Sequence, residues 1–171
     1  ISIENGGFVV NGHSDGITIY SDPSHTSDPM LRTEFNASKE IESARLYATA
    51  RGIYEFYING ERVGEDYFTP GFTEYAKRIM YQTYDVTDLL NKGQNAVGAM
   101  LSSGWWHDQM TFNLSNYNFY GDQSSLLAKL VITYEDGTTE TMTTDTENWK
   151  YYGEGPVTYA SFFNGEDYDA T

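Results

Sequence analysis

Residues 44–106 read ARLYATARGIYEFYINGERVGEDYFTPGFTEYAKRIMYQTYDVTDLLNKGQNAVGAMLSSGWW, and this stretch decides the fold. Within it, residues 53–58 are a run of aromatic and β-branched side chains, and residues 61–63 continue the run after Asn59-Gly60. Asparagine and glycine both tolerate the positive φ angles that a two-residue hairpin turn of the primed type requires. The stretch therefore predicts a tight β-hairpin at Asn59-Gly60.

Period-two alternation, which indicates a strand with one buried face, is found on both sides of this hairpin. Small or apolar side chains occupy every second position of residues 44–50, and the same alternation runs through residues 126–134. Residues 96–101 form a short apolar run that suits a buried strand. Asp136-Gly137 predicts a second hairpin, whose threonine-rich return strand at residues 138–144 is expected to be exposed.

Helical periodicity is almost absent from the chain. Further strands are predicted at residues 79–86, 149–152 and 157–163, and one short helix is predicted with Thr87 as its N-cap and Gly93 at its end. Many short strands separated by turn residues favour an all-β fold. We expect an antiparallel two-sheet β-sandwich, jelly-roll-like and galactose-binding-domain-like, with at most short helices.

Composition excludes several classes of function. The chain has 171 residues, enough for one domain, and its 25 acidic against 10 basic residues give a net charge of −15. This excess of acids argues against nucleic acid and against anionic membrane surfaces as partners, because both need clustered lysine and arginine. No apolar run approaches membrane-spanning length. The lack of cysteine removes disulfides, thiolate nucleophiles and cysteine-ligated zinc.

Two regions are predicted along the chain. Residues 1–28 are expected to be an N-terminal arm and linker, with strand-like pieces at residues 8–10 and 17–20 that indicate an edge hairpin; residues 29–171 are expected to be the β-sandwich domain. The chain opens on Ile1 without an initiator methionine or a signal peptide, so we expect an excised piece of a longer protein. Its location, cytoplasmic or exported, is left open.

Five ordered motifs carry a resemblance to a known family. They are Tyr57–Gly64 (YINGERVG), Thr69–Tyr75 (TPGFTEY), Tyr81–Leu90 (YQTYDVTDLL), Gly104–Trp106 (GWW) and Asn164–Ala170 (NGEDYDA). In this order and at this spacing they resemble the N-terminal β-sandwich domain of bacterial α-L-rhamnosidases, which are inverting glycoside hydrolases. The resemblance covers roughly residue 29 to the end of the chain. Several motifs together are far more specific than any one of them.

The resemblance implies an accessory domain without catalytic residues. In this family the catalytic glutamates belong to a separate helical barrel downstream, which would be the partner of this domain in the same chain. The parent enzyme would release terminal α-L-rhamnose. From the residues alone, glycosidic hydrolysis needs two carboxylates that flank the scissile bond, and sequence does not pair any of the 25 acids across a cleft. We therefore predict no catalytic residue and no required cofactor.

Gly104-Trp-Trp-His-Asp108 is the strongest candidate for a binding site. In an extended segment successive side chains point to opposite faces, so Trp105 and Trp106 are not both expected in one core. One exposed indole would offer a flat platform for a sugar ring, and His107 and Asp108 would supply polar contacts. These four residues are therefore predicted to contact carbohydrate. The alternative is that the indoles pack in the core and His107 hydrogen-bonds a loop.

Calcium is the second candidate ligand. Residues 113–122 and 164–169 carry asparagine and aspartate oxygens, the hard donors that calcium prefers, without the spacing of an EF-hand. Asparagine and aspartate are also ordinary turn residues. The sequence therefore allows calcium but names no metal ligand.

Three classes of function remain. The leading hypothesis is a non-catalytic accessory domain of an α-L-rhamnosidase, which supports the catalytic domain and contacts rhamnose-containing glycans. The alternative is a free-standing carbohydrate-binding module or adhesin domain, which would bind glycans tightly without any enzyme. A third class is a small hydrolase with acids of its own, and it requires turnover by this chain alone.

Overall fold

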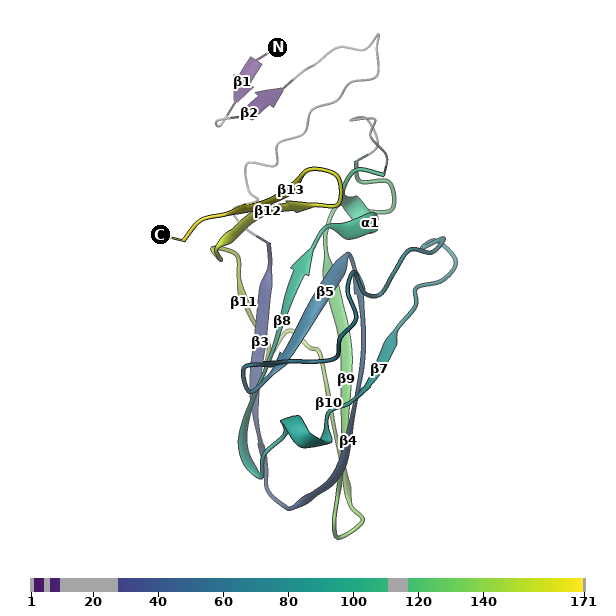
Figure 1. Cartoon of the computed structure of the whole chain (residues 1–171), viewed down its shortest axis with the longest axis vertical. Coiled ribbons are helices and arrows are strands. Elements are labelled where there is room, and N and C mark those ends of the chain that lie inside the picture. Colours follow the sequence, from purple (N-terminus) through teal and green to yellow (C-terminus); the bar gives the residue numbers. More distant parts are fainter. Residues whose placement is uncertain (1, 5–6, 10–27, 111–116, 171) are drawn as a thin grey trace.

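The computed structural model describes residues 2–4, 7–9, 28–110 and 117–170 (Figure 1). Two antiparallel sheets face each other, which confirms the predicted all-β sandwich. Their strands are β3 (Met30–Ala37), β4 (Ile41–Arg51), β5 (Ile53–Ile58), β6 (Glu61–Arg62), β7 (Gln82–Asp85), β8 (Gly93–Ser102), β9 (Ser125–Tyr134), β10 (Thr139–Thr143) and β11 (Lys150–Tyr152). The helices of the described residues are short: η1 (Thr87–Leu89) and α1 (Gly104–His107). Neither is long and apolar enough to cross a membrane.

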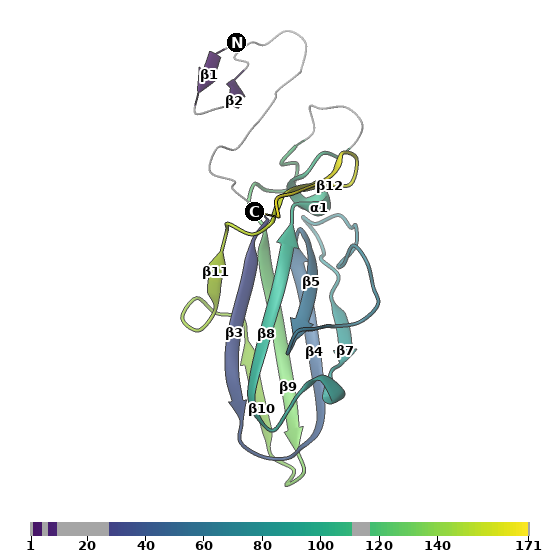
Figure 2. The same ribbon diagram turned by 60° about the vertical axis from the view of Figure 1, so that its left-hand side comes forward.

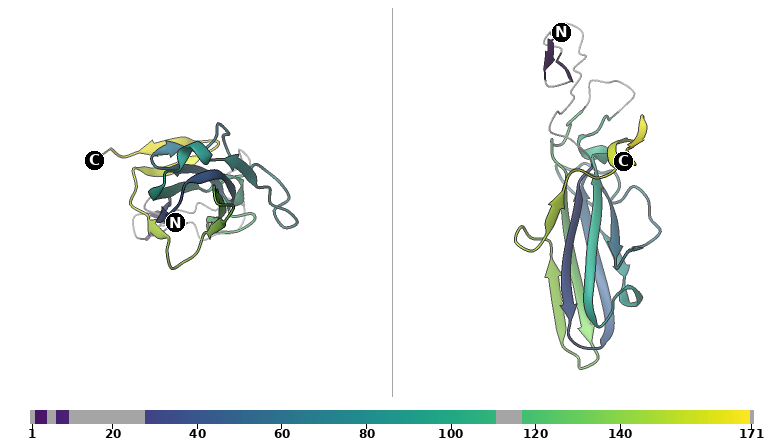
Figure 3. Two further views of the ribbon diagram at one scale, coloured as in Figure 1. Left: turned by 90° about the horizontal axis from the view of Figure 1, so that it is seen from below. Right: turned by 90° about the vertical axis from the view of Figure 1, so that its left-hand side faces the viewer.

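The two sheets have the strand orders β10-β9-β4-β7 and β11-β3-β8-β5-β6. A separate hairpin, β12 (Val157–Ser161) with β13 (Gly165–Tyr168), belongs to neither sheet. β12 is two residues shorter than the predicted strand at residues 157–163, because the turn into β13 begins at Phe162. Figures 2 and 3 show the long strands running along the sandwich, with the β12–β13 hairpin across one end beside α1.

The N-terminal region is described only where it forms strands. The sequence predicts strand-like pieces at residues 8–10 and 17–20, whereas the structure pairs β2 (Gly7–Val9) with β1 (Ser2–Glu4). Residues 17–20 and most of the linker lie outside the described residues. The division of the chain at residue 28 stays a prediction.

The core lies between the inner faces of the two sheets. Nearly complete burial is shared by Ala44, Leu46, Ala48 and Ala50 of β4, Tyr54, Phe56 and Ile58 of β5, Val97, Ala99 and Leu101 of β8, and Ala128, Leu130, Ile132 and Tyr134 of β9. The alternation predicted for residues 44–50 and 126–134 is thus confirmed. Burial of each large apolar side chain contributes about 1.5–3 kcal/mol.

Both predicted hairpins are confirmed. Asn59 and Gly60 have φ angles of 52° and 87°, and β5 pairs with β6 directly across them. The Asn59 side chain also accepts a hydrogen bond from the Ala96 amide at 2.9 Å and donates one to the Leu89 carbonyl at 2.8 Å. One residue therefore closes the turn and joins it to β8 and η1. The second hairpin joins β9 to β10, whose side chains are mostly exposed, as expected.

The strand predicted at residues 79–86 is shorter than expected, since β7 begins at Gln82. Its pairing with β4 starts at the Ala48–Gln82 pair. Just beyond that pair, the Thr49 hydroxyl donates to the Met80 carbonyl at 2.6 Å. At this point a side-chain hydrogen bond replaces a backbone ladder hydrogen bond, and β7 therefore extends no further toward Ile79.

The predicted short helix is present as η1, but the N-cap assigned to Thr87 is wrong. Val86 is the residue before the turn, and it makes no side-chain cap. The Thr87 hydroxyl instead accepts the Ala44 amide at 2.9 Å and donates to the Asp85 carboxylate at 2.6 Å. Its role is to tie the turn to β4. Gly93 also differs from expectation, because it starts β8.

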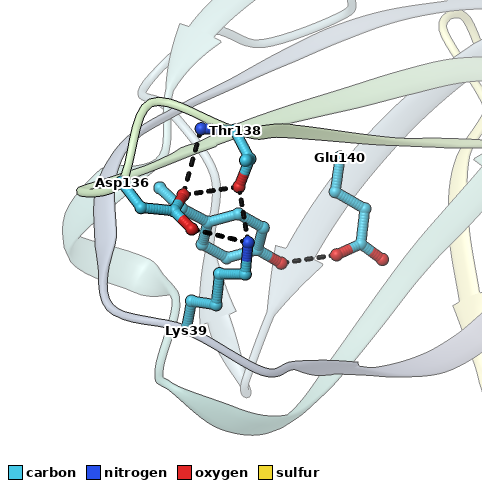
Figure 4. A network of polar contacts seen from close by, with 5 residues as sticks. Lys39, Asp136, Thr138 and Glu140 are labelled. Carbon is cyan, nitrogen blue, oxygen red and sulfur yellow. Dashed lines mark hydrogen bonds and ion pairs between the residues drawn. The ribbon is translucent and has the colours of Figure 1, made fainter.

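Asp136 organises the β9–β10 turn through a small polar network (Figure 4). Its carboxylate accepts hydrogen bonds from the Thr138 amide at 3.0 Å and from the Thr138 hydroxyl. The Lys39 ammonium, from the turn between β3 and β4, lies 2.7 Å from the same carboxylate and donates to the Thr138 hydroxyl at 2.8 Å. Hydrogen bonding from Lys39, followed by that from Thr138, lowers the pKa of Asp136 to about 2. The network joins the two sheets at the end away from α1.

Lys39→Met is expected to raise the pKa of Asp136 from about 2 toward its ordinary value, because Lys39 is the largest cause of the depression. Thr138 keeps its hydrogen bonds, so the pKa should stay below the value of about 3.9 of a free aspartate. A depressed pKa stabilises the fold above the unfolded-state pKa, and this stabilisation is lost as the pH falls toward the folded-state pKa. As the pH falls from about 3.9 toward about 2, the free energy of unfolding should therefore fall less in the variant than in the unsubstituted chain. NMR titration of the Asp136 carboxyl carbon measures the shift.

Lys77→Met is the matched control, since Lys77 pairs with Glu74 at 3.1 Å on another loop. An Asp136 pKa that is the same in both variants would contradict the assignment.

Candidate functional site

The predicted site residues lie at one end of the sandwich, where β8 leaves its sheet and enters α1 (Figure 2). α1 is a single helical turn, in which the Trp106 amide donates to the Ser103 carbonyl at 3.3 Å and the Asp108 amide to the Gly104 carbonyl at 3.2 Å. A Cβ at Gly104 would meet the Ile53 amide nitrogen at 3.0 Å, and its φ angle is 50°. Glycine at this position lets α1 lie against the start of β5.

The segment is thus a helical turn, whereas the predicted divergence of the two indoles was argued for an extended segment. The two indoles still point in different directions, because neighbouring residues of a helix are about 100° apart around its axis. Trp106 points inward and is 9% exposed, whereas Trp105 is half-buried. The predicted divergence of the two rings is found, but its physical cause is a helical turn.

Trp106 is held among aromatic and cationic groups. Its ring stacks on Tyr120 with centroids 6.1 Å apart and meets the edge of Tyr75 at 5.5 Å. The Arg51 guanidinium lies 5.2 Å from its centroid, which is cation–π distance. Tyr75 donates its hydroxyl proton to the Gly71 carbonyl at 2.9 Å, and burial raises the pKa of Tyr75 to about 12. This side of the site is a packed aromatic layer with a neutral tyrosine.

Trp105 faces the β12–β13 hairpin. Its indole stacks on Phe162 with centroids 4.5 Å apart and an interplanar angle of 25°. Phe72 also lies against Trp105, with centroids 5.6 Å apart and the two ring planes tilted by 59°. Trp105 thus fixes the hairpin to α1 through one face and meets an exposed ring beside it.

His107 and Asp108 make structural hydrogen bonds. The Nε2 atom of His107 lies 2.8 Å from the Ser124 hydroxyl, just before β9. Asp108 is 3% exposed, and its carboxylate accepts the Phe162 amide at 3.3 Å. The structure thus brings all four predicted residues together around α1. Each holds a neighbouring segment, and their contact with carbohydrate stays a prediction.

A continuous set of rings, which we call the aromatic end, surrounds α1. Its members are Phe68, Phe72, Trp105, Phe119, Tyr120 and Phe162, linked by ring contacts of 4.5 to 6.5 Å. Three of them are largely exposed, with Phe68 at 61%, Phe72 at 52% and Phe119 at 66%. Several large exposed rings in one place mark an interaction surface.

Sequence reasoning missed most of the aromatic end. Phe68 and Phe72 flank the Thr-Pro-Gly turn, and Phe162 follows β12, so the rings come from loops far apart in the chain. The available signal was the pair of phenylalanines on either side of one turn, since a turn rarely needs two large apolar residues beside it.

A pocket of about 400 Å³ opens beside the aromatic end. Phe68, Phe162, Tyr54 and Gly104 contribute to its wall, and Glu55 also lines it. The Glu55 carboxylate accepts the Tyr57 hydroxyl at 2.7 Å and lies 3.6 Å from Arg62. An apolar wall with few polar groups suits binding through packing.

The calcium prediction is not decided by the structure. Among the described residues, no three His, Asp or Glu side chains come together as metal ligands. Residues 113–116 of the first predicted loop lie outside the described part of the chain. Calcium therefore stays a prediction.

The fold and the site define a class of protein: an antiparallel β-sandwich domain whose candidate site lies on the loops at one end. The jelly-roll and galactose-binding-domain likeness within that class stays a prediction. The family is shown directly by sequence. Residues 39–171 match the alpha-L-rhamnosidase N-terminal domain, and the chain belongs to that family.

Individual relatives agree with the family. The crystal structure of Streptomyces avermitilis alpha-L-rhamnosidase complexed with L-rhamnose has a TM-score of 0.78 and 42% identity, over 84% of this chain and 14% of that one. The structure from Aspergillus terreus has a TM-score of 0.81 and 37% identity, over 92% and 17% of the two chains. An alpha-L-rhamnosidase of Alteromonas sp. strain LOR is 42% identical over 82% of this chain and 15% of its own length. The chain thus spans 14% to 17% of the length of these three relatives.

Trp105→Ala is expected to loosen the β12–β13 hairpin more than the sandwich, because the Trp105–Phe162 stack joins the two. The hairpin should lose roughly 1–3 kcal/mol of local stability, which is less than the cost of removing a fully buried tryptophan. Hydrogen exchange followed by mass spectrometry should show faster exchange in residues 157–168, with β4 and β9 little changed.

Tyr81→Ala serves as the control, since Tyr81 is 65% exposed and lies beside Tyr47, outside the aromatic end. Hairpin protection that is equal in the two variants would show that Trp105 does not hold the hairpin.

Proposed function

We propose that this chain is a non-catalytic accessory domain of an α-L-rhamnosidase, and that it supports the catalytic domain of the same protein. The observation that carries the proposal is the match of residues 39–171 to the N-terminal domain of these enzymes. The chain covers 14% to 17% of the length of the three relatives named above, so most of each of them lies outside the matched region. The parent protein would hydrolyse terminal α-L-rhamnosides with inversion.

The aromatic end is the surface that we assign to this support. Phe68, Phe72 and Phe119 expose more than half of their surface there. Rings of this size are typical anchors of interfaces, where burial against a partner removes apolar area from water. The β12–β13 hairpin, which holds the last strand of the described chain, lies at the same end (Figure 1). A partner seated on the aromatic end would therefore also lie beside the β12–β13 hairpin.

The alternative is a free-standing carbohydrate-binding module or adhesin domain. The half-buried Trp105 favours it, because a partly accessible indole is a platform for a sugar ring. Trp106 and Asp108 are buried and offer little surface to a ligand. A saccharide at this loop would therefore meet Trp105 and Phe72 first.

The purified chain is expected to release no product from an aryl α-L-rhamnoside above the buffer rate, because the proposal places the catalytic acids elsewhere in the parent. The Streptomyces avermitilis enzyme serves as the positive control. Turnover by this chain that disappears in a variant such as Glu55→Gln would contradict the proposal and favour the small hydrolase.

A titration of the same preparation with L-rhamnose, with and without calcium, distinguishes the accessory domain from the free-standing binding module. One partly accessible indole supports only weak binding, with a dissociation constant of roughly 1 mM, which corresponds to a binding free energy of about 4 kcal/mol. Micromolar binding of a rhamnose-containing glycan by the isolated chain would favour the free-standing module.

Phe72→Asp should destabilise the full-length parent protein by at least about 1 kcal/mol more than it destabilises the isolated domain, because the 52% of Phe72 that is exposed in the domain would be buried against the partner. Thermal unfolding of both proteins with and without the substitution measures the difference. Tyr81→Asp is the matched control, and it should cost the same in both proteins. An equal cost of Phe72→Asp in the two would place the partner on another surface.

A further inference from the structure

The outer face of the five-stranded sheet carries a second hollow, a trough of about 580 Å³ that runs from β11 across β3 and β8 to β5. Four adjacent strands span about 14 Å at ordinary strand spacing. The trough shares Met100 with the pocket at the aromatic end, but Trp105, Trp106, His107 and Asp108 do not line it. It is a separate surface of the domain.

The floor of the trough is Gly98. In the sheet register Gly98 lies between Arg32 of β3 and Tyr57 of β5, so a residue without a side chain separates two large ones. A Cβ added at Gly98 would meet the Leu31 carbonyl oxygen at 3.4 Å, which is ordinary contact, and its φ angle is not positive. Packing and backbone geometry therefore do not demand glycine here. Its effect is to leave the floor open.

Two tyrosine rings, Tyr57 and Tyr152, form the walls. The Tyr57 hydroxyl donates to Glu55 at 2.7 Å, which fixes the orientation of that ring. Tyr152 at the other wall is 54% exposed. Met30 and Met100, a cross-strand pair, lie half-buried between them. Such a surface accepts a flat ring with an apolar face.

The charges at the trough are unusual for this chain. Among the described residues that line it, the charged ones are Arg32 and Lys150, in a protein with 25 acidic and 10 basic residues. The two are register partners on β3 and β11, both exposed. Like charges directly opposite each other destabilise a sheet. An anion between them would remove that repulsion.

Neither cation is firmly neutralised. Arg32 lies 3.4 Å from Glu34, but both side chains are more than 60% exposed, and such a surface pair contributes little. Lys150 forms no ion pair with any described residue. Guanidinium and ammonium groups together bind a carboxylate well, since arginine binds it through two parallel hydrogen bonds.

We propose that the trough binds a carboxylate-bearing saccharide. The apolar face of a pyranose ring lies over Gly98 between Tyr57 and Tyr152, and the carboxylate of the ring meets Arg32 and Lys150. The choice of a saccharide among anions rests on the proposed function, whereas the anion site rests on the geometry of the sheet. The domain would in this way hold an acidic polysaccharide beside the catalytic part of its parent.

The test uses the full chain and trigalacturonate, with fully methyl-esterified trigalacturonate as a probe of the same shape without charge. Calorimetry and the amide shift of Gly98 report binding. We expect the acid to bind at least tenfold more tightly than the ester. The affinity for the acid should fall with added salt, because screening weakens exposed charges. Equal affinity for acid and ester would overturn the proposal.

Variants locate the site. Arg32→Gln with Lys150→Gln should weaken binding of the acid at least tenfold, Lys150→Arg should keep it, and Gly98→Ala should weaken it by filling the floor. Lys77→Gln is the control, since Lys77 pairs with Glu74 on another loop. Full binding in the double variant, with an unchanged circular dichroism spectrum, would overturn the proposal.

A short polyglutamate peptide distinguishes the kind of anion. Peptide affinity equal to that of trigalacturonate would overturn the choice of a saccharide. Turnover of rhamnoside by the isolated chain would overturn the proposed function instead and would leave these affinities unchanged, so the two failures are distinguishable.

Discussion

The structure depends on Gly52, the one residue between β4 of the first sheet and β5 of the second. β4 ends at Arg51 and β5 begins at Ile53. The φ angle of Gly52 is 121°, and a Cβ there would lie 2.3 Å from the Ser102 carbonyl oxygen, so no other residue fits. This corner places the buried face of β4 directly against that of β5. Gly104 packs on the same corner, and the aromatic end is therefore built on the point where the sheets join.

The two inner faces complement each other in size. β4 contributes alanines to the core, including Ala44 and Ala48, whereas β5 contributes Tyr54 and Phe56. Small residues opposite large ones let the sheets approach to the density of a protein interior. The core is thus filled by its own aromatic residues. The exposed rings around α1 lie outside this core, at the surface that we propose for the partner.

The sequence predicted those parts of the fold that depend on local patterns. Alternation in residues 44–50 indicates a strand with one buried face, and Asn59-Gly60 indicates the backbone angles of a tight turn. α1 escaped prediction because one helical turn is too short to show a period. The location of the candidate site was predicted from Trp105, but its exposed members were not. Phe68 and Phe162 are far apart in the sequence and come into contact only in the folded chain, so no local sequence pattern indicates their contact.

The β12–β13 hairpin shares no ladder with either sheet. Trp105 of α1 stacks on Phe162, Asp108 just after α1 accepts the Phe162 amide, and the Asp28 amide donates to the Val157 carbonyl at 2.8 Å. Opening of the hairpin therefore breaks none of the ladder hydrogen bonds of the two sheets. The sandwich and the β12–β13 hairpin are thus separate units of local stability.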